Sequence, residues 1–296
     1  MVTFYKSARL KFDSDEEFKN SARERVVQLQ QDALISCSEQ HNEDSTILMW
    51  KKICEISRKE FCQTYEMLGI ENLIEKGEST YNAMLPDVVK LCLDIKVASL
   101  SEGAVCIFPT DVDEATEGAP PPLMIQKSDG GYLYPTTDLA ALIHRVWVER
   151  ADRILYVTDL SQAEHFRKVF EAARRSGFVG TNAEYGSNEA GVDLEQRIRS
   201  ICDSVGDEDH VNLSTPQEVE LRHVGFGLVM GEDDKKLKSR EGEALRLRDL
   251  LDEALLRSGL ELEKRQLQYS ATGDQNSKDR LLTDQEVSDA ARVIGM

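Results

Sequence analysis

The chain has 296 residues, which is enough for one large domain or two modest domains with a real core. Its formal net charge of -18 argues against general nucleic-acid binding, because such binding requires Lys and Arg to displace counterions from phosphates. The charge does not exclude a local basic patch, and an acidic interior would suit a small cationic substrate. No apolar run is long enough to span a membrane, and residues 1–12 contain no signal-peptide hydrophobic region.

The first 122 residues are predicted to form a mostly helical insertion or connective region. Ser14 and Glu17 make a capping-box pattern ahead of apolar residues at helical spacing. Further helices are predicted over 46–68 and 84–95, and the apolar stripe of the first of these is assigned to the core. A short strand is expected at 105–108, before an acidic, proline-containing surface loop.

Residues 123–240 alternate between strand and helix patterns, which predicts a parallel, doubly wound sheet. The polar stretch 179–218 is interpreted as a surface insertion within this region. Strands are expected at 123–126, 132–134, 153–158 and 219–230, and helices at 137–149 and 162–175.

Residues 241–296 are predicted to be a helical segment. An apolar helical stripe begins at Leu247, and we expect Gly259 to end that helix in the C′ position. A polar linker should follow over 262–282, and Thr283 with Glu286 should cap a last helix.

Six cysteines are present, and none of them forms a Cys-x-x-Cys pair, so a zinc site is not expected. Several lie in apolar helical patterns, which favours buried thiols in a reducing compartment. The cysteines are Cys37, Cys54, Cys62, Cys92, Cys106 and Cys202.

Three polar residues are expected at the carboxyl end of the predicted sheet, where α/β folds bind ligands. Tyr134 is predicted to end a strand, Asp138 to lie in the first turn of the next helix, and Gln162 to occupy the neighbouring strand-to-helix turn. A carboxylate, a phenol and an amide would together suit a planar guanidinium, which requires several directed acceptors. The competing interpretation is that Asp138 is merely an acid favoured by the helix dipole.

A charged loop follows the predicted strand at 219–230. It carries Lys235, Lys236, Lys238 and Arg240. One interpretation is a solvated surface loop. The sharper one is a mobile cationic loop that closes on a polyphosphate as negative charge shifts onto it. The glycines before the loop have the wrong spacing for a dinucleotide fingerprint, which argues against a Rossmann oxidoreductase.

The stretches 127–141, 158–166 and 223–240 together resemble, in order and spacing, the second half of the catalytic domain of arginyl-tRNA synthetases, of the kind found in eukaryotes. Residues 236–240 resemble the class I KMSKS signature, with Ser239 where the second lysine usually stands. Three more segments resemble this family: FYKSARLKFD at 4–13, KGESTY at 76–81 and RDLLDEA at 248–254.

The resemblance implies an α/β, Rossmann-like class I synthetase catalytic domain with a helical insertion on its N-terminal side. It implies that Tyr134, Asp138 and Gln162 bind L-arginine, with Asp138 pairing with the guanidinium. The substrates would be L-arginine, ATP with Mg²⁺, and tRNA(Arg), and other synthetases are candidate partners in a cytoplasmic or organellar protein. The residues implied to act on the ATP phosphates are Lys236, the catalytic residue of this group, with Lys238, Ser239 and Arg240.

One signature of the family is missing from the sequence. Class I synthetases carry a HIGH motif in the first half of the Rossmann fold, and no such motif is present. The expectation is therefore a segment that lacks the first nucleotide-binding half and the anticodon-binding domain. A non-catalytic arginine-binding, regulatory or assembly remnant is the alternative. His165 lies in a matched stretch and is assigned a packing role.

Overall fold

The computed structural model describes residues 2–35, 45–109, 120–179, 193–204, 219–227, 247–271 and 282–295. The chain divides into two compact units, each built from segments that are distant in sequence. The first unit comprises Met1–Ala8, Met49–Ile74 and Met230–Met296, and the second comprises Arg9–Leu48 and Glu75–Val229. The contiguous domains proposed from the sequence, 1–122, 123–240 and 241–296, remain a prediction.

The first unit is helical in its described part. It contains most of α3 (Ser45–Met67), α8 (Leu247–Ala271) and α9 (Asp284–Gly295). The apolar stripe on α3 is not the core that its spacing predicted, because Ile53 is 44% and Phe61 58% exposed. Among the described residues of the whole chain, no helix is long and apolar enough to cross a membrane.

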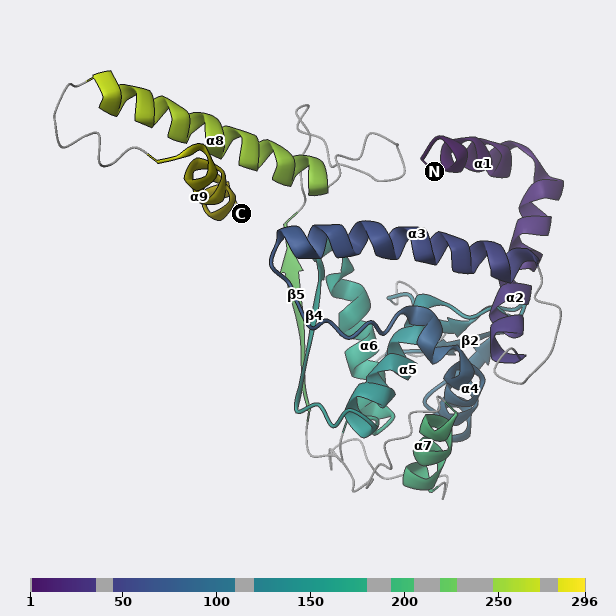
Figure 1. Ribbon diagram of the computed structural model, residues 1–296. Coiled ribbons are helices and arrows are strands. Elements are labelled where there is room, and N and C mark those ends of the chain that lie inside the picture. Colours follow the sequence, from purple (N-terminus) through teal and green to yellow (C-terminus); the bar gives the residue numbers. More distant parts are fainter. Residues whose placement is uncertain are drawn as a thin grey trace. The chain divides into compact units, whose positions relative to one another are not determined.

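Helix α8 does not end at Gly259, so the predicted helix end and the polar linker directly after it are wrong. A glycine inside a helix costs only about 1 kcal/mol relative to Ala. Ion pairs of Arg257 with Glu253 at 2.7 Å and of Arg265 with Glu261 at 3.3 Å lie on the two sides of it. The helix therefore continues to Ala271, and α9 packs against it (Figure 1).

The predicted capping box of α9 is confirmed. The Glu286 backbone N–H donates to the Thr283 hydroxyl at 3.3 Å, and the Thr283 N–H donates to the Glu286 carboxylate at 2.8 Å. These hydrogen bonds lower the pKa of Glu286. At the C-terminal end of α9, a Cβ on Gly295 would meet the Leu255 Cα at 3.1 Å, so this glycine allows the two helices to approach closely.

The N-terminal helices show a different cap from the one expected. Helix α1 (Val2–Ser14) still includes Ser14, whose hydroxyl donates back to the Leu10 carbonyl at 2.8 Å. Asp15 instead caps α2 (Glu16–Ile35) by accepting the Phe18 N–H at 3.0 Å. The predicted Ser14–Glu17 capping box is therefore wrong.

The second unit contains two small sheets. Strands β1 (Ser99–Ser101), β2 (Ala104–Ile107) and β3 (Leu123–Gln126) form an antiparallel sheet, whereas β4 (Arg153–Asp159) and β5 (Glu220–Phe226) pair in parallel. The predicted strands are thus confirmed at 123–126 and 153–158. Their membership in one parallel sheet is wrong for the described residues, since β3 pairs antiparallel with β2.

Helix α5 (Tyr134–Trp147) lies at the centre of the second unit. It contacts α4 (Leu85–Asp94), the 3-10 helix η1 (Glu78–Met84), β3, α6 (Ala163–Arg175) and α7 (Leu194–Asp203). The Trp147 indole N–H donates to the Phe178 carbonyl at 2.8 Å inside the core. Fully buried apolar side chains of this kind contribute about 1.5–3 kcal/mol each. They include Leu85, Leu91, Leu139, Leu142, Ile143 and Val169.

Helix α7 is part of this core, although it falls in the stretch that was interpreted as a surface insertion. Ile198 is 0% and Ile201 2% exposed, and both face the main apolar cluster. Their spacing places them on one side of α7, and Asp193 caps the helix by accepting the Gln196 N–H at 3.0 Å. The surface interpretation is therefore wrong for α7, while 180–192 and 205–218 lie outside the described residues.

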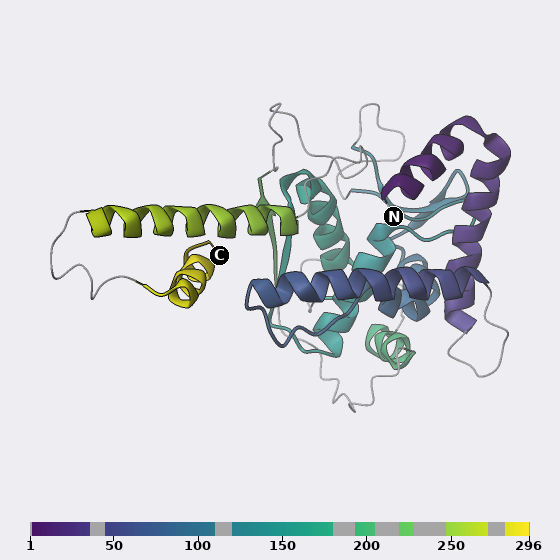
Figure 2. The same cartoon turned by 45° about the horizontal axis from the view of Figure 1, so that its top comes forward.

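The β4–β5 pair is covered on one face by α6 (Figure 1, Figure 2). Tyr156 on that face contacts the rings of Phe166 and Phe170, with ring-centroid distances of 4.7 and 5.4 Å. On the other face, Val157 is 63% and Phe226 53% exposed. Parallel sheets are normally buried on both faces, so this open apolar face is unusual for a parallel pair.

Candidate functional site

The start of α5 is tied to the antiparallel sheet by Thr136. Its fully buried hydroxyl donates to the Ile125 carbonyl of β3 and accepts the Leu133 N–H at 3.4 Å. Leu133 is extended, so Tyr134 is the first residue of α5 and does not end a strand. The prediction for Tyr134 is wrong in this respect because Pro135 suits the first turn of a helix as well as extended chain.

Asp138 is the fifth residue of α5, so it lies one turn further along the helix than predicted. Its Oδ2 atom lies 2.6 Å from Nε2 of His165, the third residue of α6. The two side chains are 26% and 23% exposed, respectively. Such a short distance is typical of a charge-assisted hydrogen bond. His165 therefore does more than pack, although its ring also meets Phe166 edge-on at 5.1 Å.

Gln162 lies at the turn between β4 and α6, as predicted. The turn is held by Asp159, whose Oδ1 accepts the Ser161 N–H at 2.8 Å within the 3-10 helix η2 (Leu160–Gln162). Gln162 and Tyr134 are both solvent-exposed. In the described part of the chain, no hydrogen bond joins Tyr134, Asp138 and Gln162 to one another. The structure links Asp138 to the start of α6 through His165, and a shared crevice for all three stays a prediction.

Glu78 is an additional acidic residue of this region. It opens η1. Partial burial of its carboxyl raises its pKa, and the charge of Asp138 raises it further. The residue as a whole is exposed, so its carboxyl is partly buried but still reaches solvent. Glu78 falls in the KGESTY segment, but no local pattern indicates that it lies near Asp138.

A buried aromatic side chain, Tyr156, lies near Asp138. Burial raises the pKa of Tyr156 to about 12, while the charge of Arg145 acts in the opposite direction and that of Asp138 adds to the increase. The Arg145 guanidinium lies 5.3 Å from the centroid of the Tyr156 ring. Charge interactions are stronger beside such a poorly solvated surface than in bulk water. The negative charge of Asp138 therefore lies near the buried ring of Tyr156.

His223 lies in β5, as expected for the strand before the charged loop. Its Nε2 lies 2.9 Å from the Thr158 hydroxyl, and its ring stacks on Phe166 with a centroid distance of 5.1 Å. The sequence His-Val-Gly-Phe at 223–226 superficially resembles a HIGH motif, but these residues lie in strand β5. The loop residues Lys235, Lys236, Lys238, Ser239 and Arg240 lie outside the described residues.

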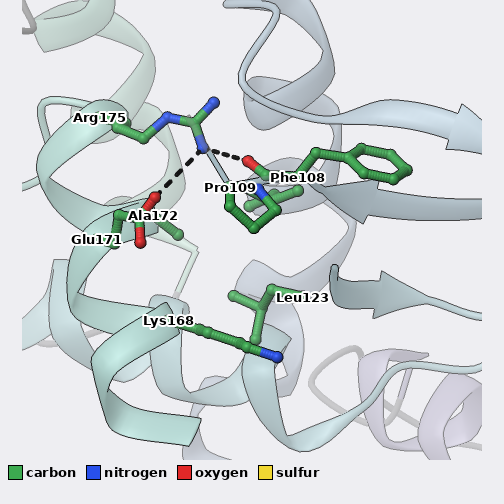
Figure 3. A pocket seen from close by; sticks show the side chains of 8 residues that line it. Phe108, Pro109, Leu123, Lys168, Glu171, Ala172 and Arg175 are labelled. Atoms are coloured by element: carbon green, nitrogen blue, oxygen red, sulfur yellow. Dashed lines mark hydrogen bonds and ion pairs between the residues drawn. The ribbon is translucent and has the colours of Figure 1, made fainter. Parts of the chain in front are cut away.

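A hollow between α6 and the ends of β2 and β3 is a separate feature (Figure 3). The Lys168 ammonium donates to the Pro121 carbonyl at 2.7 Å, and the Arg175 guanidinium donates to the Phe108 carbonyl. The hollow measures about 10 Å³, which leaves room for about one water molecule. Its two cationic side chains donate to neighbouring carbonyls, and the space is too small for an amino acid or a nucleotide.

The cysteines follow the sequence expectation only in part, because Cys62 of α3 is exposed and Cys54 is half-buried. Cys92, Cys106 and Cys202 are buried, and burial raises the pKa of the Cys92 and Cys202 thiols to about 12. These thiols are poor nucleophiles because the reactive form is the thiolate. Within the described ranges, no group of three or more His, Cys, Asp or Glu could hold a metal ion.

The comparisons with known proteins define the class of this chain as a class I tRNA synthetase catalytic domain. The family model described as "tRNA synthetases class I (R), catalytic domain" matches residues 1–207 and 209–287. The chain therefore belongs to the class I tRNA synthetase (R) family, which confirms the predicted family and fold class.

Curated relatives carry the name arginine–tRNA ligase. The protein of Nostoc sp. is 41% identical over 265 residues, which cover 90% of this chain and 37% of the relative. That of Rippkaea orientalis is 39% identical over 296 residues, covering 100% of this chain and 41% of the relative. That of Thermosynechococcus vestitus is 42% identical over 265 residues, covering 90% of this chain and 37% of the relative. The chain thus spans about two fifths of the length of these relatives.

A solved structure supports the fold. The arginyl-tRNA synthetase from Plasmodium falciparum matches with a TM-score of 0.57 and 24% identity, over 99% of this chain and 40% of that chain. The similar proteins come from bacterial and eukaryotic organisms, so the likeness is not confined to eukaryotic forms.

Proposed function

We propose that this chain is the arginine-recognising part of an arginine–tRNA ligase. The observation that carries the proposal is the family match over nearly the whole chain. The charge interaction of Glu78 with Asp138, to which the resemblance assigns guanidinium binding, supports it. The whole protein would activate L-arginine with ATP and transfer the arginyl group to tRNA(Arg). No described contact favours the regulatory or assembly alternative.

Recognition would depend on the permanent positive charge of the arginine side chain. A guanidinium stays protonated at all physiological pH values and presents several N–H donors in one plane. Two nearby carboxylates destabilise each other, and a cation between them removes that penalty. Asp138 would pair with the guanidinium, with Glu78 adding negative charge, while Tyr134 and Gln162 would orient the rest of the substrate.

The chemistry requires no nucleophile from the protein. An oxygen of the arginine carboxylate would attack the α-phosphorus of ATP, and the bond to the departing pyrophosphate would break. A tRNA ribose 2′-hydroxyl would then take the arginyl group and release AMP. The protein contributes positioning and charge stabilisation, for which we propose the loop of Lys236, Lys238, Ser239 and Arg240. Class I synthetases generally use Mg²⁺, which we assign to the ATP phosphates.

The family match supports proposals about partners beyond the small substrates. We propose that most tRNA(Arg) contacts are made outside these 296 residues, because the 296-residue chain is strongly acidic overall. We also propose other synthetases as binding partners. A cytoplasmic location is proposed as well, with an organellar form as the alternative.

The 296-residue chain is expected to bind L-arginine more tightly than L-citrulline by about tenfold or more, because citrulline has nearly the same shape without the charge that Asp138 would pair with. Isothermal titration calorimetry of the purified chain with both amino acids measures this difference. Equal affinity for the two would contradict the proposed arginine site.

The isolated chain should show little or no arginine-dependent ATP–pyrophosphate exchange, because its sequence contains no HIGH motif for the ATP phosphates. The measurement is the incorporation of labelled pyrophosphate into ATP with and without L-arginine. Robust exchange would mean that another phosphate site replaces the missing motif.

A further inference from the structure

Asp138 and His165 come from neighbouring helices and meet through one short contact. The Nε2 atom of His165 lies 2.6 Å from Oδ2 of Asp138. The other carboxylate oxygen, Oδ1, has no hydrogen bond in the part of the chain that the structure describes. Each side chain is about three quarters buried, so the contact lies below the surface while the carboxylate keeps some access to solvent.

The contact also defines which nitrogen of the His165 ring carries the proton. An ionised carboxylate only accepts hydrogen bonds, so Nε2 must be the protonated ring nitrogen. The ring itself is held edge-on against Phe166, with a centroid distance of 5.1 Å and an interplanar angle of 71°. Phe166 is buried and stacks on His223. A fixed donor thus faces a carboxylate that would otherwise rotate about its side-chain torsions.

We propose that His165 is a positioning residue of the arginine site: it holds Asp138 through Nε2–H and thereby aims Oδ1 at the substrate guanidinium. The inference rests on the proposed function. Fixing the carboxylate before binding lowers the entropy lost when the guanidinium is captured, and the planar donor fork requires correctly oriented acceptors. Asp138 makes the contact to arginine, and His165 acts only through Asp138.

Four substitutions of His165 separate positioning from packing. His165→Gln keeps an amide donor at about the distance of Nε2, whereas the amide of His165→Asn is too short to reach Oδ2. His165→Phe keeps the ring against Phe166 and removes the donor, and His165→Ala removes both. Glu164→Gln, which loses an exposed charge paired with Arg167 at 2.7 Å, serves as the matched control.

Calorimetric titration of the 296-residue chain with L-arginine should rank these variants. His165→Gln is expected to bind within about threefold of the unchanged chain, and the Asn, Phe and Ala variants about tenfold more weakly, the scale of one hydrogen bond to a charged group. The control should bind as the unchanged chain does. Near-native binding by His165→Phe, or unchanged binding in all four variants, overturns the positioning role while leaving the arginine site intact.

Nitrogen NMR of the histidine ring tests the contact without arginine. The Nε2–H tautomer of His165 should dominate in the unchanged chain, and Asp138→Ala should give a mixture of the two tautomers. A ring that is insensitive to Asp138→Ala overturns the inference. If the unchanged chain binds no arginine while the tautomer responds as expected, the proposed function fails, and the arginine-positioning role fails with it although the hydrogen bond stands.

Discussion

Asp138→Asn is expected to weaken L-arginine binding by roughly 10²-fold, the scale of a hydrogen-bonded charge pair in a poorly solvated site. Asparagine has nearly the shape of aspartate and can still accept the hydrogen bond from His165, so the substitution mainly removes the charge. Calorimetric titration of the purified chain gives the affinity, and thermal unfolding shows that the variant remains folded.

The discrimination between L-arginine and L-citrulline provides the sharper readout. If Asp138 pairs with the guanidinium, Asp138→Asn should bring the two affinities close together, because only arginine loses a charge partner. Glu164→Gln removes an exposed carboxylate from the start of α6 and should preserve the discrimination. A variant that loses affinity equally for both amino acids would indicate that Asp138 shapes the site without pairing with the charge.

Elements decided by local pattern were predictable from the sequence. The apolar run around Ile154 corresponds to β4, and the pattern that ends near Arg175 corresponds to α6. Thr283 and Glu286 form the expected capping box because both partners lie within one turn. In each case the interactions that fix the structure join residues that are close in sequence.

Elements decided by long-range contacts were not predictable in the same way. Strand β3 has the composition of a parallel core strand, yet it pairs antiparallel with β2 across the segment 108–122. Helix α7 sits in a polar stretch, and its burial depends on contacts with α5 and α4. Gly259 looks like a helix end, but α9 packs against α8 and the helix continues. Sequence spacing reports none of these partners.

The residues of the candidate site also fall into those indicated by local sequence pattern and those brought together only by folding. Asp138 and Gln162 could be proposed from the sequence because each follows a strand-to-helix pattern that is visible there. Glu78 and His165 were missed or assigned to packing because their relation to Asp138 is created by folding. A carboxylate without a nearby base in sequence gives no signal of the histidine that holds it, and only the packing of α6 against α5 shows the pair.

The second large effect concerns the charged loop, where Lys236→Ala is expected to lower the rate of adenylate formation by roughly 10²-fold or more. This is the scale seen when one preorganised electrostatic partner of a transition state is removed. Negative charge moves onto the departing pyrophosphate as the arginine carboxylate attacks, so a cation there acts on the transition state more than on bound arginine. The arginine affinity should change little, because Asp138, Tyr134 and Gln162 are unaltered.

The test requires a protein that performs the whole reaction. A suitable one is the Nostoc ligase with its matching segment replaced by this chain, which is 41% identical to that segment. Single-turnover activation is measured by rapid mixing once the hybrid has been shown to charge tRNA, with Lys235→Ala as the neighbouring control. If the loop is only a solvent-exposed surface loop, both substitutions should leave the activation rate unchanged. One exposed lysine among several contributes little to the energetics. A slow Lys236→Ala variant beside a near-normal Lys235→Ala variant is the expected result, and unchanged activation in Lys236→Ala would remove the phosphate role from the loop even though the family assignment stands.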